Sequence, residues 1–451
     1  MATEAASDGP TLLARGLDRA ADSSGPRLVT VTLPAPLGNA ANLLGLWPEQ
    51  PALAHGAWVG IGAAAELRLD ELDAATAKRW AEQVYADSEA PPPILCGSAF
   101  SSASTGHGRW KAFPGFYAML PRWTYARSAK GATLSLTAPG NLLRGAEQRA
   151  QIAGELRQLT ACLEAAPRGS AGRVEPAVEM APSRWEKLVK DALDGIRAGR
   201  FRKLVVARSA TVVASLHPSQ VFERLQALPD CTPFAARLGQ DTFVGATPER
   251  LVELSHGRFS TDALAGTAAA SKQGERGEGG AERLLQDAKN REEHRLVVDE
   301  ITRRLRPLCT ELALPAEPRL RRLKDVTHLH TPIAGRVSQG VQLLDLACAL
   351  HPTPAVAGLP GPEAVEWILA HEPEPRGWYA GFMGWFDRSG DGELSVAIRS
   401  GLLSPGLRSE GEACLYTGAG IVAGSEPAAE YRETEWKQRP FLRALGVELP
   451  A

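Results

Sequence analysis

Residues 416–437 read YTGAGIVAGSEPAAEYRETEWK and join a glycine-rich turn to a charged segment. The pattern predicts a strand that turns into a helix. Residues three and four apart share a helix face, so Glu430, Glu433 and Lys437 lie together, with Glu426 one turn upstream. A run of charges on a helix is usually a solvated surface. Two carboxylates near a nest of backbone N–H groups also suit a hard cation beside an anionic ligand. The stretch alone leaves both interpretations open.

Length and composition describe an ordinary globular protein of 451 residues, with 44% hydrophobic and 23% charged side chains. The net charge of -2 gives no electrostatic case for binding nucleic acid or an anionic membrane. No apolar run approaches the roughly 20 residues of a membrane helix, and the start lacks the apolar core of a secretory signal. We therefore expect a cytoplasmic protein with neither nucleic acid nor membrane as a partner.

The cysteines are scattered and include no CxxC pair, which argues against a zinc site and against a disulfide framework. They are Cys96, Cys162, Cys231, Cys309, Cys348 and Cys414. Most lie in apolar contexts, so a reducing compartment fits them best.

Changes in composition divide the chain into four segments. We expect residues 1–30 to be partly mobile, residues 31–165 to form an N-terminal α+β part, and residues 166–182, rich in Ala, Pro and Gly, to form a linker. Residues 183–451 form the larger C-terminal part. Within it, residues 268–282 read AAASKQGERGEGGAE, which is too polar and glycine-rich for a core and predicts a flexible loop.

Predicted strands come in runs, and helices separate the runs. Ser183 and Glu186 have capping-box spacing at the start of a helix, which Gly199 can end. RKLVVARSA then predicts a buried strand, and alternating segments over residues 234–266 predict an antiparallel meander. Later strands are expected at WYAGFMGWFD, LSVAIRSGLL and ACLYTGAGIV. This order favours the α+β class over a parallel βαβ array.

Glu293 lies in a long helix expected over residues 281–305. Val297, Ile301 and Leu305 repeat every four residues, and one step back along this apolar stripe lands on Glu293. A buried carboxylate is costly unless it is paired or binds a metal. A salt bridge to an Arg or Lys is the simpler interpretation, but together with Glu430 and Glu433 it suggests a three-carboxylate Mg²⁺ site.

Lys203 and Glu249 are candidates for proton transfer. Lys203 begins a strand whose face continues through Val205 and Ala207, so its ammonium can point inward, where desolvation makes a lysine usable as a base. A strand-end lysine that reaches water is the alternative. Glu249 follows a proline at a strand end and can project into a cleft as an acid; otherwise it is a turn residue or a partner for Arg250.

Three further polar residues stand in interior-looking contexts. Arg399, in the middle of the strand expected at SVAIRSG, is expected to pair bidentately with a carboxylate from the protein or from a ligand. His328 in VTHLHT and His351 in LHPTPAVAG can act as ligands or acid–base groups. A satisfied structural histidine is the commoner outcome for either.

Taken together, these segments resemble the chorismate-utilising enzymes, a family that includes isochorismate, salicylate, anthranilate and aminodeoxychorismate synthases. Nine pieces occur in family order over roughly residues 200–440: KLVVAR, FVGATPERL, LAGT, DAKNREEHRLVVDEI, VTHLHTPI, HPTPAVAGLP, RGWYAGFMGWFD, VAIRSGLL and GAGIVAGSEPAAEYRETEWK. The N-terminal third matches less well, through WVGIGAAAEL and FPGFYAMLPRW. The resemblance implies an α+β fold of two large antiparallel sheets packed face to face, with helices outside.

The resemblance also implies Mg²⁺ as cofactor, chorismate as substrate and roles for individual residues. Glu293, Glu430 and Glu433 resemble the acids of the metal site, Lys203 the base that activates water, and Glu249 the acid that protonates the departing hydroxyl. Substrate contacts are implied for Gly266, Thr267, His328, Ala355, Arg399, Gly418, Ala419, Gly420 and Lys437. Residues 183–451 would then be the chorismate-binding catalytic part.

Two residues indicate the branch of the family. Lys203 is typical of members that use water as nucleophile, and Ala355 stands where salicylate and anthranilate synthases, which go on to eliminate pyruvate, typically carry threonine. Both favour isochorismate synthase, with salicylate synthase second and an anthranilate or aminodeoxychorismate synthase-like subunit third. A chorismate-binding protein on a dead scaffold is the alternative to an enzyme.

We expect a monomer without a glutaminase partner, whose product feeds menaquinone, a catechol siderophore or another compound. The chain departs from the family at Pro440, which should kink or end the last helix because proline removes a backbone hydrogen bond.

Overall fold

The computed structural model describes residues 9–21, 28–166, 178–214, 217–269, 283–405 and 411–447. The segment expected to be mobile contains helix α1 (Gly9–Ala21), in which Leu13 and Leu17 are buried. Most of the expected linker and nearly all of the loop expected at 268–282 lie outside the described residues.

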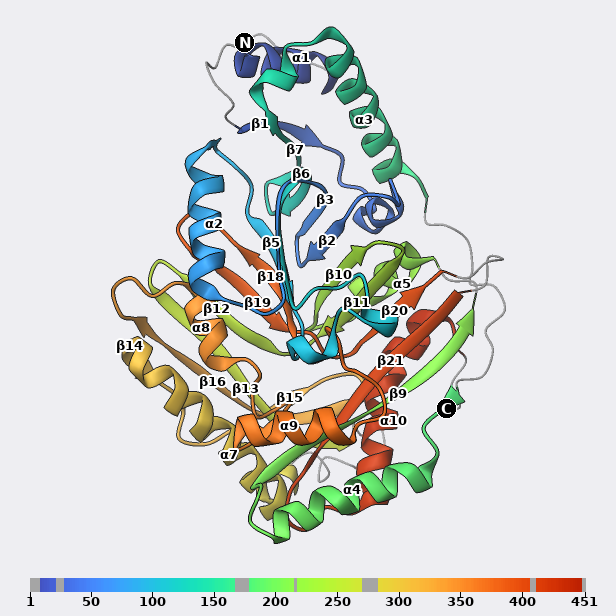
Figure 1. The fold of residues 1–451 in the computed structure, drawn as a ribbon, viewed down its shortest axis with the longest axis vertical. Coiled ribbons are helices and arrows are strands. Elements are labelled where there is room, and N and C mark those ends of the chain that lie inside the picture. Colours follow the sequence, from blue (N-terminus) through green and yellow to red (C-terminus); the bar gives the residue numbers. More distant parts are fainter. Residues whose placement is uncertain are drawn as a thin grey trace.

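The strands form one hydrogen-bonded sheet that branches into two arms. The first arm runs through antiparallel pairs from the N-terminal part into the C-terminal part (Figure 1). Its strands, in spatial order, are β1 (Leu28–Ala35), β7 (Gly131–Pro139), β6 (Phe116–Ser128), β3 (Trp58–Leu69), β2 (Ala52–His55), β10 (Thr232–Leu238), β11 (Asp241–Thr247), β20 (Ser400–Ser404), β21 (Gly411–Ile421) and β9 (Lys203–Ala214). The short strands β8 (Val178–Glu179) and β17 (Gly358–Leu359) pair with β9, and β4 (Ser88–Glu89) pairs in parallel with β1.

The second arm branches from the first at β6. Residues 123–128 of β6 pair with β7, whereas residues 116–119 pair with β5 (Ile94–Ser98). From β5 the order is β18 (Phe382–Phe386), β19 (Gly392–Val396), β12 (Arg250–Ser255), β13 (Arg258–Ala269) and β16 (Val326–Val337). The strands β14 (Cys309–Ala313) and β15 (Arg319–Arg322) pair with β16.

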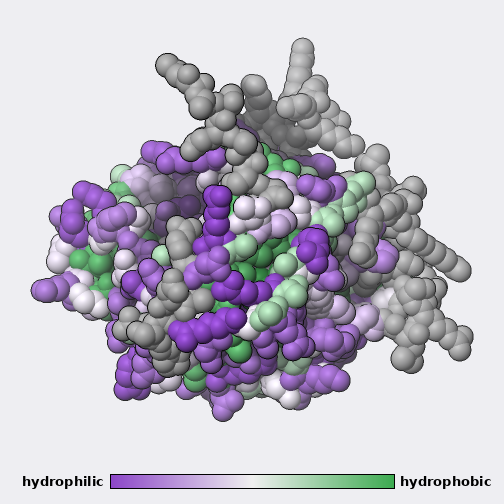
Figure 2. All heavy atoms as spheres, turned by 90° about the horizontal axis from the view of Figure 1, so that it is seen from above, coloured by the Kyte–Doolittle hydropathy of each residue, from purple (hydrophilic) through white to green (hydrophobic). Residues whose placement is uncertain are grey.

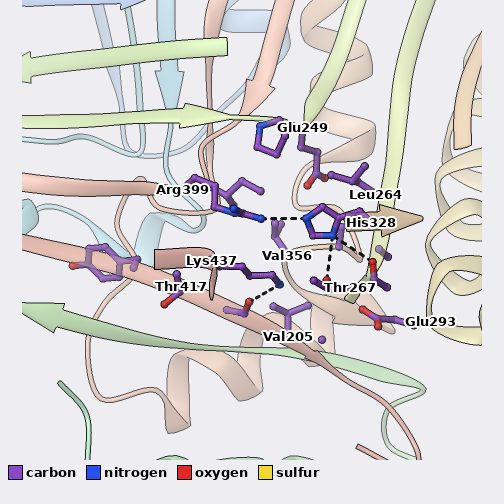
Figure 3. Close-up of a pocket in the computed structure, with 18 of the residues that line it drawn as sticks. Val205, Glu249, Leu264, Thr267, Glu293, His328, Val356, Arg399, Thr417 and Lys437 are labelled. Atoms are coloured by element: carbon purple, nitrogen blue, oxygen red, sulfur yellow. Dashed lines mark hydrogen bonds between the residues drawn. The ribbon is translucent and has the colours of Figure 1, made fainter. Parts of the chain in front are cut away.

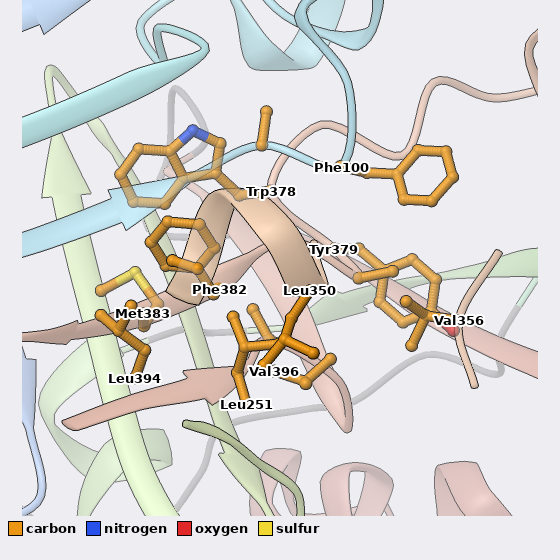
Figure 4. Close-up of a cluster of buried hydrophobic side chains, with 14 of the residues drawn as sticks. Phe100, Leu251, Leu350, Val356, Trp378, Tyr379, Phe382, Met383, Leu394 and Val396 are labelled. Carbon is orange, nitrogen blue, oxygen red and sulfur yellow. The ribbon is translucent and has the colours of Figure 1, made fainter. Parts of the chain in front are cut away.

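The space between the arms is filled by the larger of two apolar cores. Phe234 and Phe243 of the first arm and Leu251, Phe382 and Met383 of the second belong to one buried cluster. Figure 4 shows the part of this cluster formed around Trp378, Phe382 and Met383. The two arms therefore pack face to face, and the predicted α+β fold of two antiparallel sheets is confirmed.

The second core covers the other face of the first arm, because alternate residues of one strand point to opposite faces. Phe234 and Phe243 lie in the core between the arms, whereas their neighbours Ala235 and Val244 lie in the second core. The middle strands β10 and β11 are thus buried on both faces, at nearly every position.

Helices cover the outside of both arms (Figure 1). Near the N-terminal strands lie α1, α2 (Ala74–Ala86) and α3 (Ala146–Glu164). The C-terminal part carries α4 (Pro182–Arg197), α5 (Pro218–Gln226), α7 (Ala288–Leu305), α8 (Leu343–Leu350), α9 (Gly361–His371) and α10 (Pro427–Leu445). Short 3₁₀ turns lie at Ala40–Gly45, Ser102–Ser104, Gly108–Trp110 and Gly140–Leu143 in the N-terminal part and at Arg306–Leu308 in the C-terminal part. For the site, α7 packs on β13 and β16, and α10 packs on β21.

Hydrophilic side chains dominate the face shown in Figure 2, with smaller apolar areas between them. In the part of the chain that the structure describes, no helix is long and apolar enough to span a membrane. None of the six cysteines forms a disulfide among the described residues.

Four local predictions need correction. The meander is wrong, because β11 pairs with β10 and β20 while β12 pairs with β13 and β19. LSVAIRSGLL forms two strands, β19 and β20, which lie in different arms. α4 has Pro182 at its first position and Ala181 as its N-cap, so Ser183 does not open a capping box. α10 continues through Pro440 to Leu445, so the proline does not end the helix.

Candidate active site between the two sheets

Two crossings between the arms place Glu249 and Arg399 next to each other. Glu249 lies between β11 and β12, and Arg399 lies between β19 and β20. The crossings are held together by backbone hydrogen bonds, since Val396 N–H donates to the Glu249 carbonyl and Ala246 N–H donates to the Arg399 carbonyl. Both side chains can therefore enter the space between the sheets, which a mid-strand position for Arg399 would not explain.

Arg399 adopts a left-handed backbone conformation, with φ of 55°. A non-glycine residue in this region carries a cost of about 1 kcal/mol or more and is concentrated at functional sites. Its guanidinium Nη2 donates to Nε2 of His328 at 3.1 Å (Figure 3). The sequence suggested neither the break in the strand nor this partner.

His328 connects Arg399 to the turn at Gly266 and Thr267. Because Nε2 accepts from Arg399, Nδ1 carries the proton and faces the Thr267 hydroxyl at 3.1 Å and the Gly266 carbonyl at 3.3 Å. Burial first, then the charges of Arg399 and Lys437, lower the pKa of His328 well below its ordinary value. His328 is therefore neutral and acts here as a link between two walls of the site.

Gly266 forms a bulge in β13. The pairing register with β16 shifts between Ala265 and Thr267, and Gly266 has φ of 75°. A Cβ at this position would crowd Asn290 in the first turn of α7. The same Asn290 accepts a hydrogen bond from Thr267 N–H at 3.2 Å, so the bulge and the helix fix each other.

Lys203 and Glu293 form a buried ion pair on another wall. Lys203 opens β9 and is only 1% exposed, and its Nζ lies 3.1 Å from Oε1 of Glu293 in α7. Gly420 of β21 packs directly on the pair, and a Cβ there would overlap the Glu293 carboxylate and come within 3.1 Å of the Lys203 Cε. The glycine of this motif is thus needed for space, not for a special φ.

The charged residues of α10 contact two different elements, β21 and α7. Lys437 Nζ donates to Glu433 at 2.6 Å and to the Gly418 carbonyl at 3.0 Å, which ties the helix to β21. Glu430 is buried and instead accepts from Nζ of Lys289, in α7, at 2.5 Å. Burial, then the charge of Glu433, raises the pKa of Glu430.

A cavity of about 630 Å³, counting its open mouth, lies between these walls. Most of the residues that we predicted line it: Lys203, Glu249, Gly266, Thr267, Glu293, His328, Ala355, Arg399, Gly418, Gly420 and Lys437. Figure 3 shows Glu249 entering from one side, and Lys437 and Glu293 from another. Its lining of charged and apolar side chains suits a small polar organic ligand.

Three predicted residues do not line the cavity. Ala419 alternates with Gly418 and Gly420 along β21, so its side chain belongs to the apolar core. Glu430 and Glu433 lie behind the lining, on the face of α10 bonded to Lys289 and Lys437. His351 also lies elsewhere, where its Nε2 bonds to the Ala99 carbonyl at 2.9 Å as a structural histidine does.

Glu249 differs from the other acids because it has no ion-pair partner among the described residues. It is 4% exposed, and burial raises its pKa to about 8, against the smaller opposing effect of Lys203. A carboxyl group with this pKa is protonated at neutral pH. It is therefore equipped to donate a proton.

The donor chemistry of Glu293, Glu430 and Glu433 fits Mg²⁺, which prefers carboxylate oxygens and keeps several water ligands. Burial, then the charge of Glu433, raises the pKa of Glu430, and the charges of all three acids raise the pKa of Lys289. Within the described ranges, no three acidic, histidine or cysteine side chains are arranged as a coordination sphere. Each of the three instead contacts an ammonium group.

Several contributors were not predicted from the sequence. Tyr379 lines the cavity and stacks on Tyr416 with ring centroids 5.3 Å apart. Arg376 and Glu372 form a buried pair behind it, with the Arg376 Nη2 2.6 Å from the Glu372 carboxylate. Both Tyr379 and Arg376 stand in RGWYAGFMGWFD, so a buried Arg beside an aromatic residue was the available signal.

The Arg376–Glu372 pair joins the loop that carries Ala355 to the strand that carries Lys203. Arg376 donates to the Val356 carbonyl at 2.7 Å and to the Val205 carbonyl at 2.9 Å, while Glu372 accepts from Ala207 N–H at 2.7 Å. The pair therefore fixes the position of the Ala355 loop relative to strand β9, and these form two walls of the cavity.

Comparison with known protein families matches most of the chain. The profile of the family described as "Chorismate binding enzyme" matches residues 49–446, which is most of the chain. The chain belongs to the chorismate binding enzymes. The match includes every residue of the cavity lining and both arms of the sheet from β2 onward.

Curated relatives of this chorismate binding enzyme carry related names. It is 38% identical over 414 residues to the "Salicylate biosynthesis isochorismate synthase" of Pseudomonas aeruginosa, covering 89% of this chain and 85% of the relative. It is 32% identical over 373 residues to the "Isochorismate synthase MenF" of Bacillus subtilis, covering 81% and 77% respectively.

Solved structures show the same fold. The menaquinone-specific isochorismate synthase MenF from Escherichia coli superposes with a TM-score of 0.78 at 27% identity, covering 96% of this chorismate binding enzyme and 99% of that chain. Anthranilate synthase component I from Streptococcus pneumoniae, at 21% identity and a TM-score of 0.67, shares the fold.

Proposed function

We propose that this protein is an isochorismate synthase, which moves the ring hydroxyl of chorismate from C4 to C2. The observation that carries the proposal is a cavity with a buried lysine on one wall and a carboxyl group of pKa about 8 on another. A hydroxyl exchange needs a base for the entering water and an acid for the leaving hydroxyl. The names of the relatives support the same reaction.

Lys203 and Glu249 divide the proton transfers. As the base, Lys203 first gives up the proton that pairs it with Glu293; it then takes a proton from water as the oxygen bonds to C2, the ring double bonds shift, and the C4–O bond breaks. Glu249 gives its proton to the departing hydroxyl, which leaves as water. One water enters and one leaves, so substrate and product are isomers and no oxidant or reductant is required.

Three groups would hold the dianionic substrate. Arg399 lies at the cavity with one face engaged by His328, and Lys437 reaches the cavity from α10. Among the described residues, β20 pairs with β21 only as far as Tyr416. The edge of β21 after Tyr416 faces the cavity and lines it with Thr417, Gly418 and Gly420. Charged donors and free backbone N–H groups bind carboxylates with the required geometry.

Mg²⁺ would be held by Glu293, Glu430 and Glu433, whose carboxylate oxygens are ligands that it prefers. When bound, it would neutralise substrate charge that the Arg and Lys residues do not cover. The acids approach from α7 and α10, two elements that pack on the strands carrying the rest of the site.

Ala355 supports an enzyme that stops at isochorismate. It lines the cavity with a methyl group, where the resemblance places threonine in members that eliminate pyruvate. The expectations of a monomer and of no glutaminase partner are part of this proposal.

The test is incubation of the purified protein with chorismate, with and without Mg²⁺, followed by chromatography and a pyruvate assay. We expect Mg²⁺-dependent isochorismate without pyruvate. Salicylate with pyruvate would contradict the branch, and no conversion would contradict the enzyme assignment.

A further inference from the structure

Lys289 is a charged residue that the proposed chemistry does not use. It stands in the first turn of α7, where a positive side chain opposes the helix dipole. Its Nζ donates to Oε1 of Glu430 at 2.5 Å, and its side chain remains 31% exposed. Local helix energetics therefore do not explain its position, but the pairing with Glu430 does.

The charges around Lys289 are those of the proposed metal site. Lys289 donates to Glu430, and the carboxylates of Glu293 and Glu433 are near enough to act on its charge. The three carboxylates therefore act together on one ammonium. Lys203 and Lys437 already compensate Glu293 and Glu433, which leaves Lys289 as the counter-charge of the buried Glu430.

An ammonium and a divalent cation that approach the same carboxylate compete for it, because both are positively charged. Mg²⁺ binds carboxylate oxygen at roughly 2.0–2.1 Å, so a metal on Glu430 would lie within a few ångströms of the Lys289 nitrogen. The repulsion between them is strong in a partly buried site. The exposed side chain of Lys289 has a route into solvent, whereas Glu430, which is 2% exposed, is fixed within the protein.

We propose that Lys289 is a resident counter-ion that competes with Mg²⁺ for Glu430. In the metal-free protein its ammonium stabilises the acidic cluster, and binding of the metal displaces it into solvent. The residue thereby limits the affinity of the substrate-free protein for Mg²⁺. This inference rests on the proposed function, because it concerns the metal site of that reaction.

The experiment compares Mg²⁺ binding to the substrate-free wild type and to Lys289→Met, measured by isothermal titration calorimetry. Methionine keeps the length of the side chain and removes the charge. Lys190→Met is the matched control, because Lys190 forms an exposed ion pair with Glu186 on α4, away from the cavity. Thermal unfolding with and without Mg²⁺ is recorded for each protein, and Lys289→Gln replaces the methionine variant if that variant does not fold.

We expect Lys289→Met to bind Mg²⁺ more tightly than wild type, on the order of tenfold. We also expect it to melt at a lower temperature without metal and to recover with Mg²⁺, since Mg²⁺ replaces the missing counter-charge. Lys190→Met should match the wild type in both measurements, and adding Glu430→Gln to Lys289→Met should abolish the gain in affinity.

Unchanged or weaker Mg²⁺ binding by Lys289→Met, with the control unaltered, would overturn the inference. Absence of Mg²⁺ binding in every protein would overturn it together with the metal site. Isochorismate formation by the same wild-type preparation reports on the proposed function separately, so the two failures are distinguishable.

Discussion

The ammonium of Lys203 and the carboxylate of Glu293 lie 3.1 Å apart, although 90 residues separate them in the sequence. Lys203 opens β9, Glu293 lies in α7, and Gly420 of β21 packs against both. The proposed base for water activation is thus held by three separate elements. The Lys203–Glu293 contact therefore depends on Gly420, which has no side chain to displace it.

Gly420→Ala should impair turnover without unfolding the protein. The added methyl group would overlap the Glu293 carboxylate and press on Lys203. We expect kcat to fall by about 10²-fold or more, since small displacements of reacting groups have effects of this size. Steady-state kinetics with chorismate measures the loss, beside Gly45→Ala as control, because a Cβ on Gly45 meets no atom within 4 Å. Equal kinetics for the two variants would contradict the packing argument.

Lys203→Ala should reduce turnover by about 10²–10⁴-fold, the usual contribution of a general base. Binding of chorismate should persist, because Arg399, Lys437 and the edge of β21 remain. Equilibrium dialysis of chorismate and single-turnover product formation separate the two effects. Turnover at the wild-type rate would exclude Lys203 as the base.

Glu249 gives the reaction a pH limit on the alkaline side. Burial raises its pKa to about 8, and its role requires the protonated form, so kcat should fall as pH rises through about 8. Glu249→Gln keeps the shape but cannot transfer a proton, so activity should be lost at every pH. A pH–rate profile tests the wild type, and a flat profile from pH 7 to 9 would remove the acid role.

Ala355→Thr should introduce some release of pyruvate. The change adds a hydroxyl to the cavity wall at the position where the resemblance places threonine in enzymes that continue to salicylate or anthranilate. The measurement is a coupled pyruvate assay beside chromatography of the aromatic products. If the variant forms isochorismate and no pyruvate, Ala355 is not the residue that stops the reaction.

Breaking the Arg376–Glu372 pair should destabilise the fold strongly. Arg376→Met leaves the buried Glu372 carboxylate without its partner, and such a loss typically costs about 3–5 kcal/mol in the free energy of unfolding. The exposed pair of Arg197 and Asp194 provides the control, since Arg197→Met should cost no more than about 1 kcal/mol. Urea unfolding compares the two, and similar midpoints would show that the buried pair contributes little.

Local patterns predicted single strands and charged lining residues such as Lys203, Glu249 and Glu293, whereas the packing of two sheets and the small residues of the lining were implied by the resemblance to the family. Alternation and β-branched runs mark the strands, and a carboxylate on an apolar stripe marks Glu293. The arm to which each strand belongs carries no such mark. β11 and β12 are neighbours in the chain but pair with different partners, since the chain crosses between the sheets at Glu249.

The missed contributors owe their roles to contacts across long distances in sequence. Lys289 is one of many charges in DAKNREEHRLVVDEI, and only the packing of α7 near α10 identifies it as the partner of Glu430. Arg399 looked like a mid-strand residue because its left-handed backbone interrupts a run that reads as continuous. The family motif implies a substrate contact for Ala419, but strand alternation turns its side chain into the core.

The most direct test of the account is the reaction of chorismate in water enriched in ¹⁸O, with the product analysed by mass spectrometry. Water attack at C2 with loss of the C4 hydroxyl predicts isochorismate that carries one heavy oxygen atom on the ring, formed by wild type and not by Lys203→Ala. Unlabelled isochorismate, or labelled product at the same rate from Lys203→Ala, would contradict the assignment of this cavity as a site where lysine-activated water replaces a hydroxyl.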